Sequence, residues 1–286
     1  MVTSVDAHVH VFRALSERYP RAVHPMFPPE MEAPVEDLLS TMDSHGIDRA
    51  VLVPLSAHDE YVGECLSKHG SRFAGIGVLE SERSGDADDV RRRFSEAGIQ
   101  GLRVHRLGHA SARSVENLET WPVLETLEEL HGILWLYVAA EELPSLSLVL
   151  DRLPGLRVVL NHLGWALPPE FEIDDLGRPK IRGPIPPPTL PTVLDLARYD
   201  TVHVMFSGEY AFSQENFPYS DVAEVVRAIY GAYGGERMLW ASDYPWVKQQ
   251  PGYEPQLRLV DHYLPDIRPQ ERAAIMGGTA ARLFRF

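Results

Sequence analysis

The sequence predicts an α/β fold: a single (β/α)8 TIM-like barrel that spans residues 1–286, with long loops after its first and sixth strands. Three observations predict it. Eight apolar runs typical of β-strands recur along the chain, amphipathic stretches typical of helices lie between them, and a glycine often precedes the next apolar run. Strands that alternate with helices form a parallel sheet, and eight such units in 286 residues favour a closed barrel. A doubly wound open sheet is the alternative.

The predicted strands are rich in Val, Ile, Leu and Phe. They cover residues 4–11, 49–54, 72–79, 99–105, 132–138, 156–162, 200–207 and 236–242. Several glycines end a helical stretch just before such a run, and we expect them at the C′ position of the helix, where glycine accepts a positive φ. These are Gly46, Gly70, Gly98, Gly132, Gly155 and Gly235.

Helices are predicted where apolar residues repeat every three or four positions. Residues 35–42 begin directly after Pro34, a favourable residue for a first helical turn. The stretches 90–97, 124–130 and 222–229 carry apolar residues at helical spacing. Each stretch lies between two predicted strands, as a barrel requires.

Two connections are too long for ordinary strand-to-helix loops, which usually have about 2–6 residues. Residues 12–33 follow the first strand, and residues 163–191 follow the sixth and include Pro186-Pro187-Pro188. Both leave the end of the barrel where such enzymes carry their active sites. Because proline limits the entropy lost on ordering, we interpret them as a semi-rigid substrate lid. Tolerated surface insertions are the alternative.

The composition is that of a soluble globular protein, 44% hydrophobic and 24% charged. The net charge of −14 argues against nucleic acid and anionic membrane surfaces as partners. The single cysteine, Cys65, excludes an intramolecular disulfide and indicates a reducing compartment, and no signal peptide is recognisable. We therefore expect a cytoplasmic protein. The sequence leaves the oligomeric state open, a homo-oligomer included.

His8 and His10 are the first residues that point to chemistry. Residues i and i+2 of a strand point to the same face, so both imidazoles project together, with Asp6 one step behind. Two imidazoles on one strand can serve as metal ligands or as polar catalytic groups. A strand that happens to carry two histidines is the plain alternative.

Polar groups also follow other apolar strands, at the end where a barrel enzyme performs catalysis. Asn161-His162 ends strand six and Ser242-Asp243 ends strand eight. Three histidines and a carboxylate suit one zinc ion, and an aspartate either ligates or accepts a proton from bound water. Strand four ends in a cationic cluster made of Arg103, His105, Arg106 and His109. Because guanidinium groups bind carboxylates in a bidentate manner, the cluster predicts a small anionic substrate.

Three segments together resemble the strand signatures of the amidohydrolase superfamily, and of its amidohydrolase 2 branch in particular. They are Asp6-Ala7-His8-Val9-His10, Asn161-His162-Leu163-Gly164 and Ala241-Ser242-Asp243-Tyr244-Pro245-Trp246. The junction 42–53 and the segments 207–210, 218–221 and 279–284 are similar to further parts of that branch, so the resemblance covers nearly the whole chain.

The chain departs from many members of the branch on two strands. Where relatives have a metal-binding histidine on strand five, this chain has Tyr137, and strand four carries Arg103 instead of a bridging lysine or glutamate. This pattern is most similar to the lactonase group: pyrone-dicarboxylate lactonase, sulfomuconolactone hydrolase and sugar lactonases. The resemblance implies that Arg103 and Tyr137 hold a substrate carboxylate, and Arg106 in the following loop is a further candidate.

The resemblance also implies one divalent ion, zinc in some members, at His8, His10, His162 and Asp243, while other members work without metal. We expect hydrolysis of a lactone or similar cyclic ester bearing an anionic group, with Asp243 and His162 as catalytic residues and Asp243 accepting the proton of the attacking water. Non-oxidative decarboxylation of an aromatic or unsaturated acid is the second hypothesis. A non-catalytic barrel that binds a small acid is the third.

Overall fold

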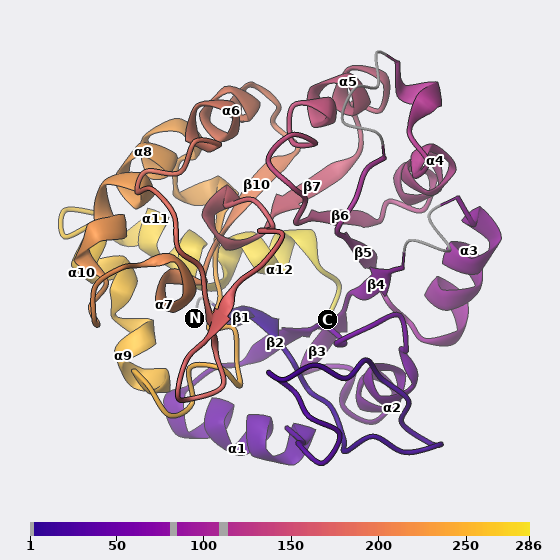
Figure 1. The fold of residues 1–286 in the computed structure, drawn as a ribbon, viewed down its shortest axis with the longest axis horizontal. Coiled ribbons are helices and arrows are strands. Elements are labelled where there is room, and N and C mark those ends of the chain that lie inside the picture. The colour runs from indigo at the N-terminus through magenta and orange to yellow at the C-terminus, as the bar shows by residue number, and fades with distance from the viewer. Residues whose placement is uncertain (1–2, 81–84, 109–113) are drawn as a thin grey trace.

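The computed structural model describes residues 3–80, 85–108 and 114–286. Its strands lie at the centre of the molecule and its helices surround them (Figure 1). All pairings between the central strands are parallel. One sheet is three-stranded, with β1 (Val5–Val9), β2 (Arg49–Leu52) and β3 (Phe73–Gly75) in that order. The other is six-stranded, with β4 (Gly77–Leu79), β5 (Gly101–Val104), β6 (Ile133–Leu136), β7 (Arg157–Leu160), β10 (Val202–Phe206) and β11 (Met238–Trp240) in that order.

The two sheets are adjacent at both of their ends. Only Ile76 separates β3 from β4, and its backbone N–H donates to the carbonyl of Leu52 at 2.9 Å. At the other end, the backbone N–H of His10 donates to the carbonyl of Tyr244, just beyond β11, at 2.7 Å. The strand order follows the chain and lacks the reversal that defines a doubly wound sheet, so that alternative is rejected. The predicted strand 72–79 is divided into β3 and β4.

Helices lie around the strands, most of them on the outside (Figure 1). They are α1 (Val35–His45), α2 (Glu60–His69), α3 (Ala87–Glu96), α4 (Trp121–Glu129), α5 (Ser145–Arg152), α6 (Leu190–Asp195), α7 (Glu209–Phe212), α8 (Ala223–Tyr233), α9 (Tyr253–Leu257), α10 (Leu259–Tyr263), α11 (Pro269–Ala273) and α12 (Thr279–Leu283). α1 begins after Pro34 as predicted, whereas α2 and α5 are absent from the predicted set. No helix in the described ranges is long and apolar enough to cross a membrane.

The prediction of positive φ at six glycines is confirmed at two of them. Gly46 has φ 67° and Gly98 has φ 72°, both left-handed. The prediction is wrong for Gly70, which continues the helical conformation with φ −52°. It is also wrong for three glycines that lie outside the left-handed region, Gly132, Gly155 and Gly235; in the last case the neighbouring Gly234 takes the positive φ instead.

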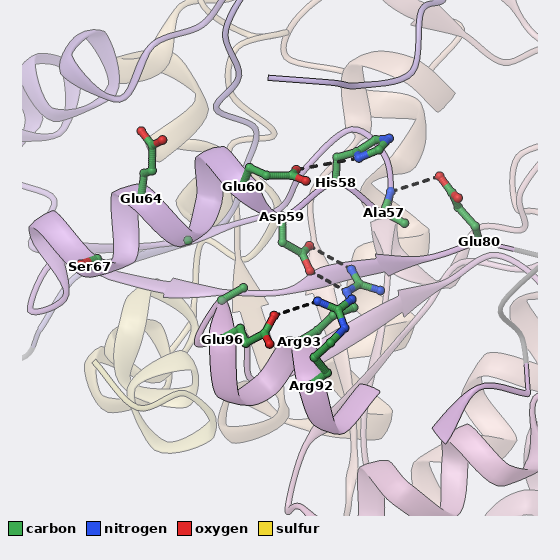
Figure 2. Close-up of a pocket in the computed structure, with 12 residues that line it drawn as sticks. Ala57, His58, Asp59, Glu60, Glu64, Ser67, Glu80, Arg92, Arg93 and Glu96 are labelled. Atoms are coloured by element: carbon green, nitrogen blue, oxygen red, sulfur yellow. Dashed lines mark hydrogen bonds and ion pairs between the residues drawn. The ribbon is translucent and has the colours of Figure 1, made fainter. Parts of the chain in front are cut away.

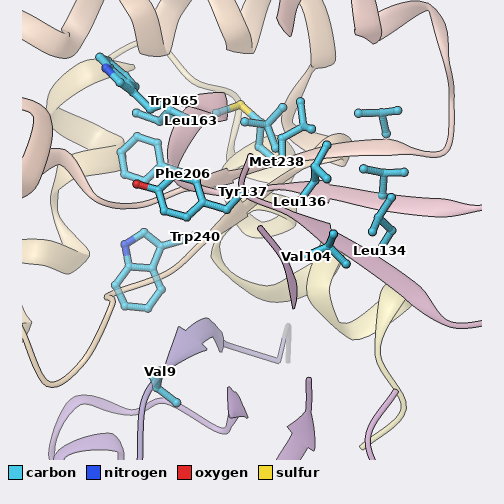
Figure 3. Packing of buried hydrophobic residues seen from close by; sticks show 14 of the residues in the cluster. Val9, Val104, Leu134, Leu136, Tyr137, Leu163, Trp165, Phe206, Met238 and Trp240 are labelled. Atoms are coloured by element: carbon cyan, nitrogen blue, oxygen red, sulfur yellow. The ribbon is translucent and has the colours of Figure 1, made fainter. Parts of the chain in front are cut away.

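Buried side chains form two layers on opposite faces of the strands. The larger cluster packs strand residues against the helices and includes Leu134, Phe206 and Trp240 (Figure 3). The smaller one gathers alternate residues from strands of both sheets, among them Val51, Ile76, Trp135, Val159, Met205 and Leu239, together with Ala280, Leu283 and Phe284 at the chain's end. Since side chains alternate along a strand, Tyr137 and Asp243, two positions beyond Trp135 and Ala241 of this smaller cluster, reach the site described below.

The two long connections lie where the sequence predicts them. An antiparallel bridge between Phe12 and Ala33 closes the first one at its base. The second contains a short antiparallel hairpin of β8 (Glu172–Ile173) and β9 (Pro179–Lys180). Both connections contribute residues to the same cavity.

Candidate active site

A cavity of about 270 Å³ lies at the carboxyl ends of the central strands. Its lining contains five of the predicted site residues, each at the end of a different strand. They are His10, Arg103, Tyr137, His162 and Asp243, which follow or end β1, β5, β6, β7 and β11. The strands therefore bring together residues that are far apart in the sequence.

His8, His10 and Asp243 form a compact group, which we call the His–His–Asp group. Their ligand atoms all lie within 4.8 Å of one another, and all three residues are buried. The Nε2 atoms of His8 and His10 are 3.0 Å apart, and each is 3.6 Å from Oδ1 of Asp243. The structure thus gathers three of the four predicted metal ligands around one point.

His162, the fourth predicted ligand, lies on the other side of the Asp243 carboxylate. Its Nε2 is 3.9 Å from Oδ2 of Asp243, and its Nδ1 is hydrogen bonded to Oγ of Ser207 at 2.9 Å. Gly208 permits this position, because a Cβ there would lie 2.7 Å from Nδ1 of His162. Gly208 also has φ 84°, which side-chain-bearing residues rarely adopt.

The imidazoles are in the neutral form. Burial lowers the pKa of His10 to about 3 and those of His8 and His162 well below the ordinary value, and the Arg103 charge adds to the effect. His10 Nδ1 donates to the carbonyl of Val53 at 2.9 Å, because that oxygen can only accept. This leaves the lone pair of Nε2 directed into the His–His–Asp group. Neutral imidazole nitrogens and a carboxylate oxygen are the donors that a zinc ion requires, so these residues fit a divalent metal.

Asp243 is held in place from several sides. The hydroxyl of Tyr210 donates to its Oδ2 at 2.6 Å, and burial raises the pKa of Asp243 to about 6. Asp243 has φ 62° and His162 has φ 44°, a left-handed backbone that is strained for residues with side chains. Strain of this kind persists where the surroundings fix a functional geometry.

Asp6 fixes the segment after β11 to β1. Its carboxylate accepts hydrogen bonds from the backbone N–H of Ser242 at 2.9 Å, the hydroxyl of Ser242 at 2.5 Å and the hydroxyl of Tyr253 at 2.6 Å. Burial raises the pKa of Asp6 to about 6. Asp6 therefore positions the neighbour of Asp243 and is not part of the His–His–Asp group.

Arg103 is the cation of the cavity. Its guanidinium lies over the ring of Tyr137, 5.3 Å from the ring centroid, and its buried Nε has no hydrogen-bond partner. His105 also lines the cavity, and burial lowers its pKa to about 3, so it is neutral. Arg106, by contrast, is half exposed, lies 3.4 Å from the carboxylate of Glu119 and does not line the cavity. His109 lies outside the described residues.

Tyr210 and Ser207 were not among the predicted site residues, although the segment 207–210 ends β10 in the same way as the other strand ends. The polar residues after the strand were the available signal. The apolar part of the lining was not predicted either. It comprises Met26, Phe27, Leu55, Leu167, Phe171, Ile181, Phe212 and Trp246 among others.

A larger cavity of about 730 Å³ lies elsewhere, beside α2 and α3 (Figure 2). Its charged residues bind one another. Arg93 donates to both carboxylate oxygens of Asp59, at 2.5 and 2.9 Å, and Arg92 donates to Glu96 at 2.9 Å. Because these groups already satisfy one another and the predicted site residues lie in the smaller cavity, we assign the chemistry to the smaller one.

A parallel α/β fold with histidines and an aspartate gathered at its strand ends defines an enzyme of the amidohydrolase type. The chain belongs to the Amidohydrolase family, whose sequence profile matches residues 5–286. It is 24% identical over 292 residues to 4-sulfomuconolactone hydrolase of Rhizobium radiobacter, covering 98% of this chain and 89% of that one.

Two solved structures share the fold. One, from Acinetobacter baumannii, is described as a probable 2-pyrone-4,6-dicarboxylic acid hydrolase with citric acid bound; its TM-score is 0.75 at 20% identity, over 99% of this chain and 100% of that one. The other is an amidohydrolase from Burkholderia multivorans with bound zinc, with a TM-score of 0.72 at 20% identity over 98% of each chain.

Proposed function

We propose that the protein hydrolyses a lactone or related cyclic ester that carries an anionic group. The observation that carries the proposal is that His10 and Asp243 of the His–His–Asp group line the same cavity as Arg103, whose buried Nε has no hydrogen-bond partner. The first supplies a place for water activation and the second a partner for an anion. The similarity to a sulfomuconolactone hydrolase supports the same reaction class.

His8, His10 and Asp243 would hold one divalent ion, with His162 as a further ligand or as an acid–base group. When bound, such an ion supplies Lewis acidity and lowers the pKa of a water molecule toward neutrality. The neutral imidazoles and the zinc bound by the Burkholderia multivorans amidohydrolase support zinc as the ion.

The chain's own residues then divide the reaction between them. Arg103 and Tyr137 bind the anionic group and orient the ring. Asp243 accepts a proton as the water oxygen bonds to the ring carbonyl carbon, while Tyr210 holds the second carboxylate oxygen. The bond between that carbon and the ring oxygen then breaks, and the proton passes from Asp243 to the leaving oxygen. The product is an open-chain hydroxy acid, or its keto tautomer when the leaving oxygen is an enolate.

We further propose that the two sheets close into the predicted (β/α)8 barrel as one domain. The chain-order arrangement of the strands supports closure, as do the backbone hydrogen bonds from His10 to Tyr244 and from Asp243 to His8. The smaller buried cluster, which mixes residues of both sheets, supports it as well.

Hydrolysis is tested with the purified, zinc-loaded protein and a panel of five- and six-membered lactones that bear a carboxylate or sulfonate. Base uptake at constant pH measures ring opening, and a carbon dioxide assay on the same samples detects decarboxylation. We expect ring opening without carbon dioxide release. Release of carbon dioxide in step with turnover would favour the decarboxylase hypothesis, and binding of acids without turnover would favour a binding protein.

A further inference from the structure

Away from the His–His–Asp group, the cavity is walled by apolar side chains from the two long connections. Met26 and Phe27 come from the first, and Leu167, Phe171 and Ile181 from the second. The two connections contact each other, since the ring centroids of His24 and Phe171 are 5.5 Å apart. The polar side chains of the described lining are therefore concentrated near the strand ends, and the outer side chains named here are apolar.

The described lining of the cavity also contains few cationic side chains. Among the described residues that line the cavity, Arg103 is the only arginine or lysine. Arg178 and Lys180 flank the lining residue Pro179, but both are engaged elsewhere. Arg178 pairs with Asp174 at 2.8 Å, and Lys180 donates to the backbone carbonyl of Tyr210 at 3.0 Å. The described lining thus provides one arginine that can neutralise an anionic group.

We infer that the substrate carries a single anionic group and an apolar substituent, and is neither a polyhydroxylated sugar lactone nor a dicarboxylate. This inference rests on the proposed lactone hydrolysis and specifies its substrate class. The anionic group binds Arg103 while the apolar substituent covers Phe171, a lining residue that is 37% exposed. A hydroxyl placed against this wall loses its hydrogen bonds to water, which lowers affinity roughly tenfold per group. Among the described residues of the lining, a second carboxylate finds no arginine or lysine besides Arg103.

The apolar surface continues outward from the cavity. A neighbouring cavity of about 390 Å³ shares Leu167, Pro168, Ile181 and Phe212 with it and is lined further by prolines of the second connection, by Glu141 and by Arg182. Arg182 is engaged by Glu172, to which its Nε donates at 3.2 Å. A substituent longer than the first cavity therefore meets the leucine, isoleucine, phenylalanine and proline side chains that line the second one. A phenyl group or a short alkyl chain is the kind of substituent that fits.

Two measurements on the zinc-loaded protein test the inference. The first compares kcat/KM for three lactone acids with the same ring: one with a phenyl substituent, one with two hydroxyls and one with a second carboxylate. The second compares, by calorimetry, the affinities of 3-phenylpropanoate, gluconate and isophthalate. We expect the phenyl compound to lead by at least tenfold in both series. A lead by the hydroxylated or the doubly charged compound in either series overturns the inference.

The two proposals fail in different ways. If no lactone is opened but 3-phenylpropanoate binds most tightly, the hydrolytic function is rejected and the ligand class stands. If lactones are opened with a preference for hydroxylated or doubly charged rings, the function stands and the substrate class is rejected.

A pair of variants locates the preference. Phe171→Asn places a polar side chain in the lining, and Leu176→Asn does the same in the same connection at a residue that is 39% exposed but does not line the cavity. We expect Phe171→Asn to reduce the preference for the phenyl compound at least fivefold and Leu176→Asn to leave it within twofold. If both variants prefer the phenyl compound to the same degree, Phe171 and the apolar lining around it do not determine the substrate class.

Discussion

Arg103 should contribute to function without contributing to stability, and the substitution Arg103→Met separates the two. Methionine keeps an unbranched side chain and removes the guanidinium. Because the buried Nε has no hydrogen-bond partner and burial lowers the pKa of Arg103, the folded protein holds a poorly compensated charge. Its removal leaves no hydrogen-bond partner unsatisfied and gives up only the contact with the Tyr137 ring and the longer-range attraction to Asp243. We therefore expect the free energy of unfolding to change by less than about 1 kcal/mol.

The same substitution should impair catalysis. A charge-assisted hydrogen bond contributes about 1.5–3 kcal/mol. Loss of that contribution to the anionic group lowers kcat/KM roughly 10- to 100-fold. A neutral methyl ester of the same lactone lacks the interaction and should be affected less than about threefold.

Arg93→Met is the matched control, because Arg93 is buried too but is paired with Asp59 through two hydrogen bonds. Breaking a buried pair leaves the other charge uncompensated and costs about 3–5 kcal/mol. We expect a large loss of stability in urea denaturation and an unchanged preference for anionic over neutral lactone. The reasoning is refuted if Arg103→Met lowers the free energy of unfolding by about 3 kcal/mol or more, the lower end of the cost of breaking a buried pair. It is refuted equally if both lactones lose the same factor in kcat/KM.

Four further outcomes are expected. Asp243→Asn should lower kcat by roughly 10²–10⁴-fold and leave the affinity for the acid product nearly constant, and an unchanged kcat would contradict its role as proton acceptor. Tyr210→Phe removes the hydroxyl that orients the Asp243 carboxylate, so kcat should fall about tenfold at unchanged KM, whereas a rise in KM alone would indicate a substrate contact. Dialysis against a chelator should abolish turnover, added zinc should restore it, and metal analysis should give one ion per chain. Full activity of the metal-free protein would show that the reaction needs no metal ion. Burial raises the pKa of Glu209 to about 7, whereas the ordinary glutamate value is about 4.3. Between these two pH values the folded state binds more protons than the unfolded state, so the free energy of unfolding falls as the pH rises through that window. Glu209→Gln should therefore be more stable than the parent at pH 8, by about 1–3 kcal/mol, and the gain should disappear below pH 4; equal curves at all pH values would contradict it.

The parallel α/β arrangement could be predicted because its signal is local. Apolar runs and amphipathic stretches alternate along the chain, and the strands form where those runs lie. The interruption at Ile76 could not be predicted, since its side chain is as apolar as its neighbours and the break reflects a change of pairing partner from β2 to β5. α5 was missed although Leu146, Val149 and Leu150 are buried at helical spacing, because its leucines also resemble a strand.

The chemical centre was predictable to the extent that strand geometry determines it. The i, i+2 rule placed His8 and His10 together, and the alternation along β5 placed Arg103 in the cavity. Arg106 lies beyond the strand, where alternation no longer applies, and its partner Glu119 is set by loop geometry. The apolar wall arises from connections without periodicity, so no pattern in the sequence indicates which of their residues face the cavity.

The origin of each part of the site also determines how it can change. The His–His–Asp group is fixed by hydrogen bonds at the strand ends. Asp6 accepts one from Ser242, the carbonyl of Val53 accepts one from His10, and Asp243 accepts one from Tyr210. Each of these contacts is short and buried, so small shifts carry a large penalty. The wall around Phe171 is made by side chains of surface connections, whose replacement disturbs no strand. Changes of substrate should therefore arise in residues 12–33 and 163–191, while changes at the strand ends should remove the reaction itself.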